Sequence, residues 1–198
     1  MKMEPMKCGT EEFEVHLPAD LIAAELEPNQ VELPQRTPAE HIRWALDHPV
    51  DSAPLKELVK AGDKVCIIIS DVTRRWQSPE TYIPVLIAEL ESAGVRDEDM
   101  LIISATGTHR RQTPEEHMGL VTKEVYDRIE LVDHVCTDEE NLAYVGTTTR
   151  GTPVWLDKRA LACDKIILTG GVVYHFMAGF GGGRKSIQIG RASCRERV

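Results

Sequence analysis

Val65-Cys66-Ile67-Ile68-Ile69 decides the fold, because an unbroken run of apolar and mostly β-branched residues is typical of a strand buried on both faces. Two similar runs follow, Met100-Leu101-Ile102-Ile103-Ser104 and Lys165-Ile166-Ile167-Leu168-Thr169. Amphipathic stretches separate the three runs, as in βαβ units. The sequence therefore predicts an α/β fold, Rossmann-like, with a mostly parallel sheet flanked by helices.

Helix starts can be read between these runs. Thr37-Pro38-Ala39-Glu40 and Thr113-Pro114-Glu115-Glu116 each combine a capping threonine, a proline in the first turn and a glutamate three residues after the cap. Ser78-Pro79 is expected to open another helix, which Gly94 is expected to end.

We expect residues 1–187 to form the N-terminal, cofactor-binding or catalytic domain of a larger protein, cut off after Ile187. It should include a small N-terminal β segment at Phe13 to Leu17 and a more exposed pair of strands at Leu142 to Val145 and Pro153 to Leu156. Residues 188–198 lack helical and strand periodicity, and from Ile189 onward they read like a translated sequencing adapter. We interpret them as a non-native tail and leave them out of the fold prediction.

Composition limits the classes of partner. The net charge is −9 and no run of lysine or arginine occurs, so neither nucleic acid nor a membrane surface is expected to bind through general charge. No apolar stretch reaches the roughly 18 to 20 residues that span a bilayer. The five cysteines form no C-x-x-C pair, which favours reduced thiols and a cytoplasmic protein, and no structural zinc site is expected.

A polar loop follows each of the three apolar runs. The loops contain Ser70 to Arg75, Ala105 to Arg111, and the glycine-rich stretch from Gly170 to Ser186. Since parallel strands end at the same edge of a sheet, the three loops should meet in one cleft there. Glycine backbone and several cationic side chains suit a small carboxylate or phosphate ligand.

His109 and His175 are the candidate catalytic residues, because imidazoles titrate near neutral pH and a facing pair can exchange proton donor and acceptor roles. Chemistry that inverts a stereocentre needs such a pair. The alternative for either one alone is a structural hydrogen-bonding role. The remaining histidines are interpreted as surface or packing residues: His16, His41, His48, His117 and His134.

Arg74 is the candidate ligand for a substrate carboxylate, since a planar guanidinium can bind both oxygens. The alternative is a salt bridge between Asp71 and Arg74 that only stabilises the loop. Asp71 could also orient a neighbouring group. Arg75, Arg110 and Arg111 are interpreted as solvated loop charges.

Lys185 has two functional interpretations. The stretch Gly179 to Ser186 approaches the phosphate-binding pattern G-x-x-x-x-G-K-[ST], in which backbone amides and lysine hold phosphates. However, Arg184 stands where that pattern requires its second glycine. The other interpretation is a lysine that bonds covalently to a cofactor or substrate.

Together the loops resemble the N-terminal domain of the nickel-dependent lactate racemase family, over nearly all of Phe13 to Ile187. The resemblance depends on three segments in the family's order and spacing: Ser70-Asp71-Val72-Thr73-Arg74, then Thr106-Gly107-Thr108-His109-Arg110 with Thr113-Pro114-Glu115-Glu116 behind it, and His175-x-x-Ala178-Gly179-Phe180-x-Gly182-Gly183-x-Lys185.

The resemblance implies a racemase or epimerase of a 2-hydroxy acid. Lys185 would carry a nickel-pincer nucleotide, a pyridinium mononucleotide whose sulfur groups hold nickel, through a thioamide. His109 and His175 would alternate in removing the hydroxyl proton while hydride moves to the cofactor and back. Arg74 would hold the substrate carboxylate, and Asp71 would contact the cofactor.

The sequence departs from the family in two ways. Arg75-Trp76-Gln77 stands where the family usually has proline, which leaves lactate or another 2-hydroxy acid as the substrate. The family's nickel-binding histidine and second domain would lie beyond Ile187, so no metal ligand is assigned and the chain alone is expected to be inactive. The alternatives are a kinase-like NTPase that uses the glycine-rich loop and a non-catalytic ligand-binding module.

Overall fold

The structure is a computed structural model that describes residues 2–27, 29–175, 179–183 and 185–188, with the backbone alone at residues 2, 175, 185 and 188. Contacts divide the chain into two units, Met1–Gln35 and Arg36–Val198. Residues 189–198 lie outside the described residues, and so does nearly all of the tail predicted at 188–198.

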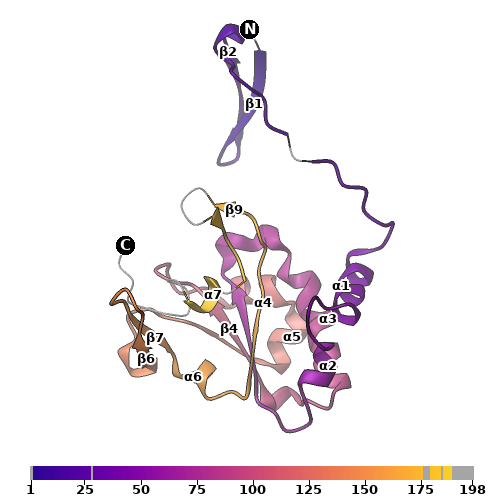
Figure 1. Cartoon of the computed structure of the whole chain (residues 1–198), viewed down its shortest axis with the longest axis vertical. Coiled ribbons are helices and arrows are strands. Elements are labelled where there is room, and N and C mark those ends of the chain that lie inside the picture. Colours follow the sequence, from indigo (N-terminus) through magenta and orange to yellow (C-terminus); the bar gives the residue numbers. More distant parts are fainter. Residues whose placement is uncertain (1, 28, 176–178, 184, 189–198) are drawn as a thin grey trace. The chain divides into compact units, whose positions relative to one another are not determined.

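The first unit contains an antiparallel hairpin of β1 (Lys2–Cys8) and β2 (Glu11–Leu17), followed by η1 (Ala19–Leu21) (Figure 1). Gly9 has a φ of 65° in the turn, a conformation that costs glycine little. The β segment predicted near the N-terminus is confirmed, and it pairs with a strand that the sequence analysis does not identify.

A four-stranded parallel sheet forms the centre of the second unit. Its order is β5-β4-β3-β8, and it pairs Ile67 with Ile102 on one side and with Ile167 on the other. The three predicted strands are confirmed, and the fourth, β5, was not predicted. The strands are β3 (Val65–Ser70), β4 (Met100–Ala105), β5 (Glu130–Asp133) and β8 (Lys165–Leu168).

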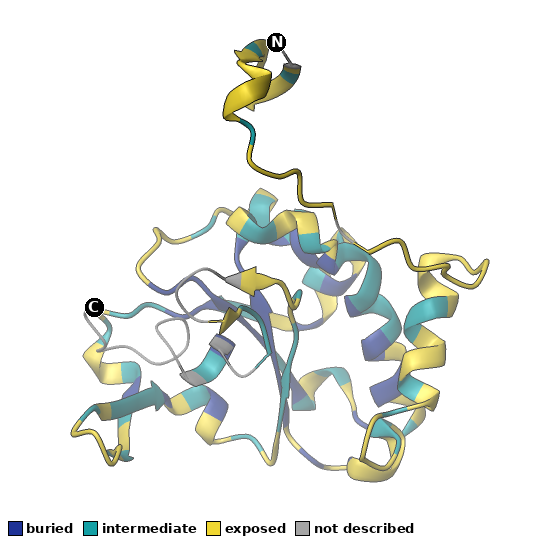
Figure 2. Cartoon of the chain, turned by 45° about the horizontal axis from the view of Figure 1, so that its top comes forward, coloured by how far each residue is buried: buried dark blue, intermediate teal, exposed yellow. Residues whose placement is uncertain are grey.

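Both faces of the sheet are covered, because successive side chains of β3 point to opposite sides. Ile67 and Ile69 belong to one buried cluster, together with Ile83 of α3 (Pro79–Ser92). Ile68 belongs to a second cluster, together with Ala160 of α6 (Lys158–Leu161). Figure 2 shows the buried strands between more exposed helices. The predicted sheet flanked by helices is therefore confirmed.

The helices begin where the sequence predicts. Thr37 and Thr113 each accept a hydrogen bond from the backbone N–H three residues later, and the glutamate there binds back, so both capping boxes are formed. Ser78 precedes the third helix but makes no side-chain capping hydrogen bond. Gly94, with a φ of 89°, follows its end. These helices are α1 (Pro38–Asp47), α3 (Pro79–Ser92) and α4 (Pro114–Val121).

Shorter elements complete the second unit. The predicted exposed pair of strands is confirmed as β6 (Leu142–Thr147) and β7 (Pro153–Asp157), which are antiparallel. No helix in the described part of the chain has the length and apolar character needed to cross a membrane. The other elements are α2 (Leu55–Leu58), η2 (Val72–Gln77), η3 (Asp97–Asp99), α5 (Lys123–Arg128), η4 (Glu139–Asn141), α6 (Lys158–Leu161), β9 (Tyr174–His175), β10 (Gly179–Phe180) and α7 (Lys185–Gln188).

Candidate active site

Three loops leave the carboxyl ends of β3, β4 and β8 at one edge of the sheet, because these strands are parallel. Side-chain contacts bring the loops together. His109, after β4, binds Asp71, after β3. Gly171, after β8, lies so close to Trp76 of η2 that an added Cβ would be 3.2 Å from the indole ring. The first loop therefore contacts both of the others.

Asp71 and His109 form a hydrogen-bonded pair. The Asp71 side chain is only 2% exposed, and its Oδ2 lies 2.5 Å from Nδ1 of His109, while Oδ1 accepts a hydrogen bond from the Thr73 hydroxyl. An ionised carboxylate can only accept, so Nδ1 of His109 donates and the neutral ring keeps its free lone pair on Nε2. Because the His109 side chain is 47% exposed, that ring can still meet a ligand. The pair suits a general base that a carboxylate orients.

Arg74 lies in η2 and is half-buried. Its backbone N–H donates to the carbonyl of Asp71, but its guanidinium forms no hydrogen bond or ion pair with another described residue. The alternative of a structural Asp71–Arg74 salt bridge is therefore wrong for the described residues, since the carboxylate binds His109 and Thr73 instead. The guanidinium is left available for an anion.

The glycine-rich loop is closely packed at one place and open at others. Gly182 has a φ of 85°, and a Cβ added there would lie 2.3 Å from the carbonyl oxygen of Gly171. Two backbone segments therefore meet where no side chain fits. Gly179 and Gly183 also have positive φ, but a Cβ added at either would meet nothing within 4 Å. The described atoms leave the backbone of these two glycines accessible to a ligand.

One buried polar atom beside this loop has no partner in the part of the chain that the structure describes. Oε1 of Gln77 is buried and makes no hydrogen bond with the described residues, and a Cβ added at Gly170 would lie 3.8 Å from it. Unpaired buried acceptors are rare in folded proteins, and a bound group that donates a hydrogen bond is one explanation for them. Together with the accessible glycine backbone, Gln77 fits a polar group such as a nucleotide. Within the described ranges, no three His, Cys, Asp or Glu side chains are grouped as metal ligands.

His175 and Lys185 are placed by their backbone alone. His175 ends β9 and pairs with Gly179 of β10, and Lys185 begins α7. Their side chains lie outside what the structure describes, so the roles assigned to them remain predictions. The hairpin β9–β10 stands between Leu168, the end of β8, and Lys185. This connection differs from the short strand-to-helix turn of the phosphate-binding pattern. Arg184, which also departs from that pattern, lies outside the described residues.

Behind Asp71 lies a buried network that the sequence analysis does not identify. Gln112 and His117 both donate hydrogen bonds to the carboxylate of Asp133. Although burial alone would raise it, the pKa of the Asp133 carboxyl is held below its ordinary value by these bonds. No local sequence signal marks Gln112 or Asp133, because their partners are distant in the chain.

A second buried network lies next to the first. His134 binds Asp157 through Nδ1, and Arg159 binds the same carboxylate. Burial opposes ionisation of Asp157, but the hydrogen bonds from Arg159 and His134 outweigh it and lower its pKa. His117 and His134 are therefore packing residues, whereas His16 and His48 are exposed. This outcome agrees with the interpretation of these four histidines from the sequence.

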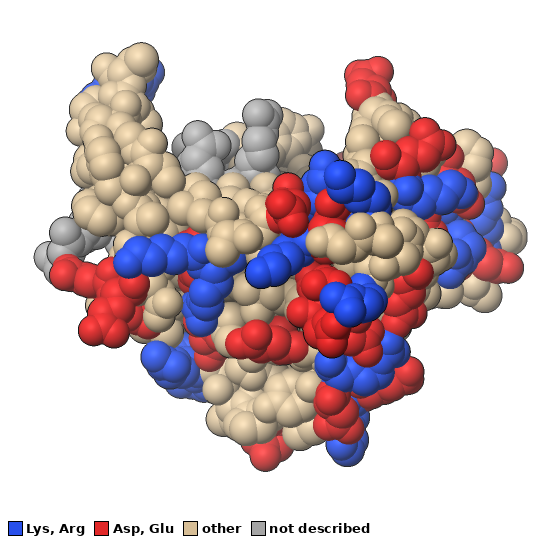
Figure 3. All heavy atoms as spheres, turned by 90° about the horizontal axis from the view of Figure 1, so that it is seen from below, with Lys and Arg blue, Asp and Glu red and all other residues tan. Residues whose placement is uncertain are grey.

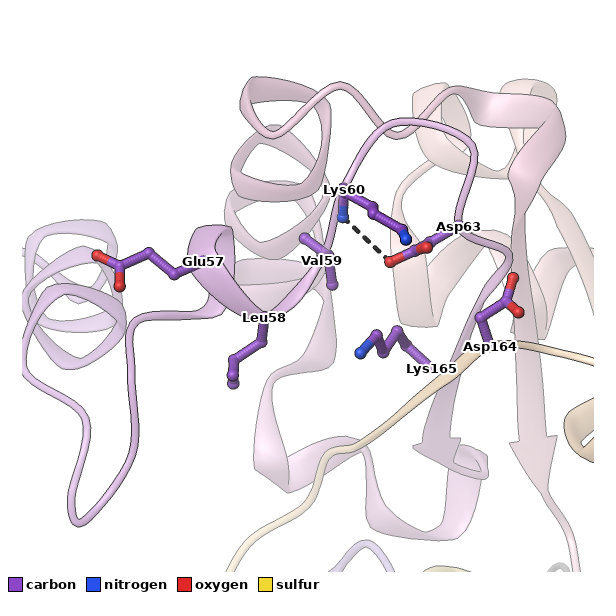
Figure 4. Close-up of a pocket in the computed structure, with 7 residues that line it drawn as sticks. All are labelled: Glu57, Leu58, Val59, Lys60, Asp63, Asp164 and Lys165. Carbon is purple, nitrogen blue, oxygen red and sulfur yellow. Dashed lines mark hydrogen bonds between the residues drawn. The ribbon is translucent and has the colours of Figure 1, made fainter.

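The other surface features lie away from this edge. Seen from below, lysines and arginines are interspersed with acidic residues (Figure 3). A depression of about 390 Å³ is lined by Lys60, Asp63, Asp164 and Lys165 among others (Figure 4). Lys165 is the first residue of β8, so this depression lies at the amino edge of the sheet, opposite the candidate site. Asp63 already accepts a hydrogen bond from the backbone N–H of Lys60.

Comparison with known proteins finds one matching family and two similar proteins with established names. A family model described as the lactate racemase N-terminal domain matches residues 8–196. A lactate racemase of Lactiplantibacillus plantarum is 36% identical over 154 residues, which are 78% of this chain and 36% of that protein. A lactate racemase of Thermoanaerobacterium thermosaccharolyticum is 32% identical over 152 residues, 77% of this chain and 35% of that protein. The chain thus spans about a third of the length of these curated relatives.

Two solved structures share the fold. The lactate racemase apoprotein of Thermoanaerobacterium thermosaccharolyticum superposes with a TM-score of 0.80 at 28% identity, over 98% of this chain and 44% of that one. A protein from Thermotoga maritima superposes with a TM-score of 0.63 at 25% identity, over 80% of this chain and 39% of that one.

Proposed function

The chain belongs to the lactate racemase N-terminal domain family, and on this premise we propose that it supplies the catalytic edge of a racemase or epimerase acting on lactate or another 2-hydroxy acid. The observation that carries the proposal is the Asp71–His109 pair. The loop of Asp71 also carries Arg74, whose guanidinium has no partner among the described residues. The activity is that of a whole protein in which this domain takes part.

The polar groups divide the work by their chemistry. Arg74 binds the carboxylate of the substrate, which fixes carbon 2 relative to the loops. His109, with Nδ1 held by Asp71, uses Nε2 to take the proton from the substrate hydroxyl and later to return it. His175 does the same from the opposite side, since inversion of a stereocentre must run equally well from both faces.

The group that we propose to complete the site is the nickel-pincer nucleotide, held covalently by Lys185 and contacted by the glycine-rich loop. When bound, it supplies an acceptor that takes the hydrogen of carbon 2 with its electron pair and then returns it. The accessible backbone at Gly179 and Gly183 and the buried acceptor of Gln77 support this assignment. The family resemblance implies that Asp71 contacts the cofactor. From its hydrogen bond to His109, we propose instead that Asp71 orients the His109 ring.

The free state of the described cysteines, Cys8, Cys66, Cys136 and Cys163, supports a cytoplasmic location, which we also propose.

The test is interconversion of L- and D-lactate by the whole protein that carries this domain, loaded with nickel-pincer nucleotide and run in D₂O. Because carbon 2 keeps its own hydrogen in a hydride mechanism, we expect racemised product without deuterium at carbon 2. Substituting His109→Gln should reduce the rate by at least about 100-fold, in the range of a lost general base. Arg110→Gln is the matched control, since Arg110 is exposed and pairs with Glu116.

Three outcomes contradict the proposal. Deuterium at carbon 2 would indicate removal of a proton rather than a hydride. Binding of lactate without interconversion would indicate a ligand-binding module. Tight binding of Mg-ATP that Lys185→Ala abolishes would indicate the phosphate-binding alternative.

A further inference from the structure

Gln112 connects the ends of three strands. Its side-chain Oε1 accepts a hydrogen bond of 2.7 Å from the backbone N–H of Val72, just after β3. Its Nε2 donates to Oγ of Ser104, in β4, and to Oδ1 of Asp133, the last residue of β5, at 2.7 and 2.8 Å. Its own backbone N–H donates to the other oxygen of Asp133 at 2.7 Å. The side chain is half-buried.

The chemistry of the partners determines the orientation of the amide. The backbone N–H of Val72 can only donate, so it must face the carbonyl oxygen of Gln112. The carboxylate of Asp133 can only accept, and its pKa lies below the ordinary value, so it must face the NH₂ group. Both N–H groups and the carbonyl are therefore used, and glutamate could not make the same set of bonds.

One of these bonds acts on Asp71 through the peptide that follows it. Val72 follows Asp71, so the bond to its N–H fixes the peptide plane from which the Asp71 side chain extends. Gln112 also lies three residues after His109 on the same loop. One residue thus joins the loop that carries the carboxylate to the loop that carries the imidazole.

Gln112 is itself held in place by Asp133, which His117 also contacts. Nε2 of His117 lies 2.9 Å from Oδ1 of Asp133, and both residues are buried. A continuous series of hydrogen bonds therefore runs from His117 through Asp133 and Gln112 to the loop of Asp71. Such a series keeps its members in one arrangement, because each buried polar group would lose its partner if it moved.

We propose that Gln112 is a positioning residue that keeps Asp71 in place to hold His109 with its proton on Nδ1 and its lone pair on Nε2. The catalytic consequence rests on the proposed function, whereas the effect on the His109 ring does not. Gln112 touches no reacting atom in this proposal. It acts through the peptide after Asp71.

The test is the tautomer of His109, read from the ring nitrogen chemical shifts of the ¹⁵N-labelled chain in its neutral form. We expect the wild type to carry the proton on Nδ1. Gln112→Met keeps the length of the side chain but removes its hydrogen bonds, so the Nε2-protonated form, which free imidazole favours, should become the major one. Thr113→Ala is the matched control, because it removes the neighbouring helix cap without touching Val72.

A second variant removes the same hydrogen bond from the other side. Val72→Pro deletes the N–H donor but leaves Gln112 bound to Ser104 and Asp133. Asp71, at φ −74° and ψ 177°, already has the extended conformation that a residue before proline requires. Val72→Pro should therefore change the tautomer of His109 in the same direction as Gln112→Met does. If Gln112→Met does not fold, Val72→Pro decides the question.

Kinetics of the loaded whole protein supply an independent measurement. Gln112→Met should lower kcat by about 10- to 100-fold, which is the usual effect of removing a group that helps to orient a functional histidine. KM should change by less than about twofold. An unchanged His109 tautomer in the folded variant would overturn the inference even if racemisation is found. Conversely, the wild type could lack racemase activity while the variants show the expected change of the His109 tautomer. That result would overturn the proposed function and leave the positioning role supported.

Discussion

Position 182 accepts only glycine for two separate reasons. Its φ of 85° lies in the left-handed region, and a Cβ there would overlap the carbonyl of Gly171. Gly151 has almost the same φ, 84°, but a Cβ added there meets nothing within 4 Å. The two glycines therefore separate the cost of the backbone conformation from the cost of the close approach.

Alanine substitutions at these two positions should differ in a measurable way. Gly151→Ala is expected to lower the free energy of unfolding by about 1–2 kcal/mol, the cost of a left-handed L-residue. Gly182→Ala should lose about 1–3 kcal/mol more, as overpacked sites do. Urea unfolding of both variants measures the difference. Equal losses would show that the two backbone segments are not in contact.

The individual candidate residues can be recognised in the sequence, but their pairing cannot. Asp71 and Arg74 are three positions apart, which makes a local salt bridge an obvious expectation. The structure instead joins Asp71 to His109, which is 38 positions away. Whether two loops approach to hydrogen-bonding distance depends on the register of the sheet, and no property of either residue alone reveals it.

At the scale of elements, β3 carries most of the fold because it lies between β4 and β8 and is buried along its whole length. Ile67 is fully buried in the cluster that includes α3. Ile67→Ala should therefore lower the free energy of unfolding by about 2–5 kcal/mol, through lost burial and the cavity left behind. Val50→Ala, at an 88% exposed position, is the control and should change it by less than about 0.5 kcal/mol.

Denaturant unfolding of these two variants provides the measurement. A loss below about 1 kcal/mol for Ile67→Ala would mean that β3 is not the tightly packed centre of the sheet.

The elements that the sequence reveals are those with local signals. The two capping boxes and the three apolar runs depend on neighbouring residues, so they can be read without a structure. By contrast, β5 consists of only Glu130-Leu131-Val132-Asp133, with acidic residues at both ends, and its short apolar centre resembles many loops. It becomes a strand because β4 presents an unpaired edge to it.

For the molecule as a whole, two buried carboxylates make the free energy of unfolding decrease at acidic pH. The pKa values of Asp133 and Asp157 are both lower in the folded state than the ordinary value of 3.8. Between the folded-state pKa values and 3.8, the unfolded chain therefore binds more protons than the folded chain. The stabilisation is complete above pH 3.8 and is lost as the pH falls through the folded-state pKa values. We expect the free energy of unfolding to fall steeply below about pH 4.

Asp157→Asn tests the origin of this dependence. It leaves Arg159 without this carboxylate partner. Because the Arg159 side chain is 29% exposed and can still be hydrated, we expect a loss of about 1–3 kcal/mol at neutral pH, as for a lost hydrogen bond to a charged group. The slope of stability against pH below 3.8 should become smaller, because one of the two carboxylates is gone. Urea unfolding at several pH values measures both effects. An unchanged slope would place the acid sensitivity elsewhere.

The sequence by itself determined the parallel sheet, the helix starts, and the three loops that carry the candidate residues. It did so because apolar runs and capping patterns act over a few neighbouring positions. Only the tertiary structure decided that Asp71 holds His109 and not Arg74, and that Gln112 joins the loops of both. These contacts link residues that are 38 and 40 positions apart in the sequence. Residues so far apart come into contact only after the strands have paired in register.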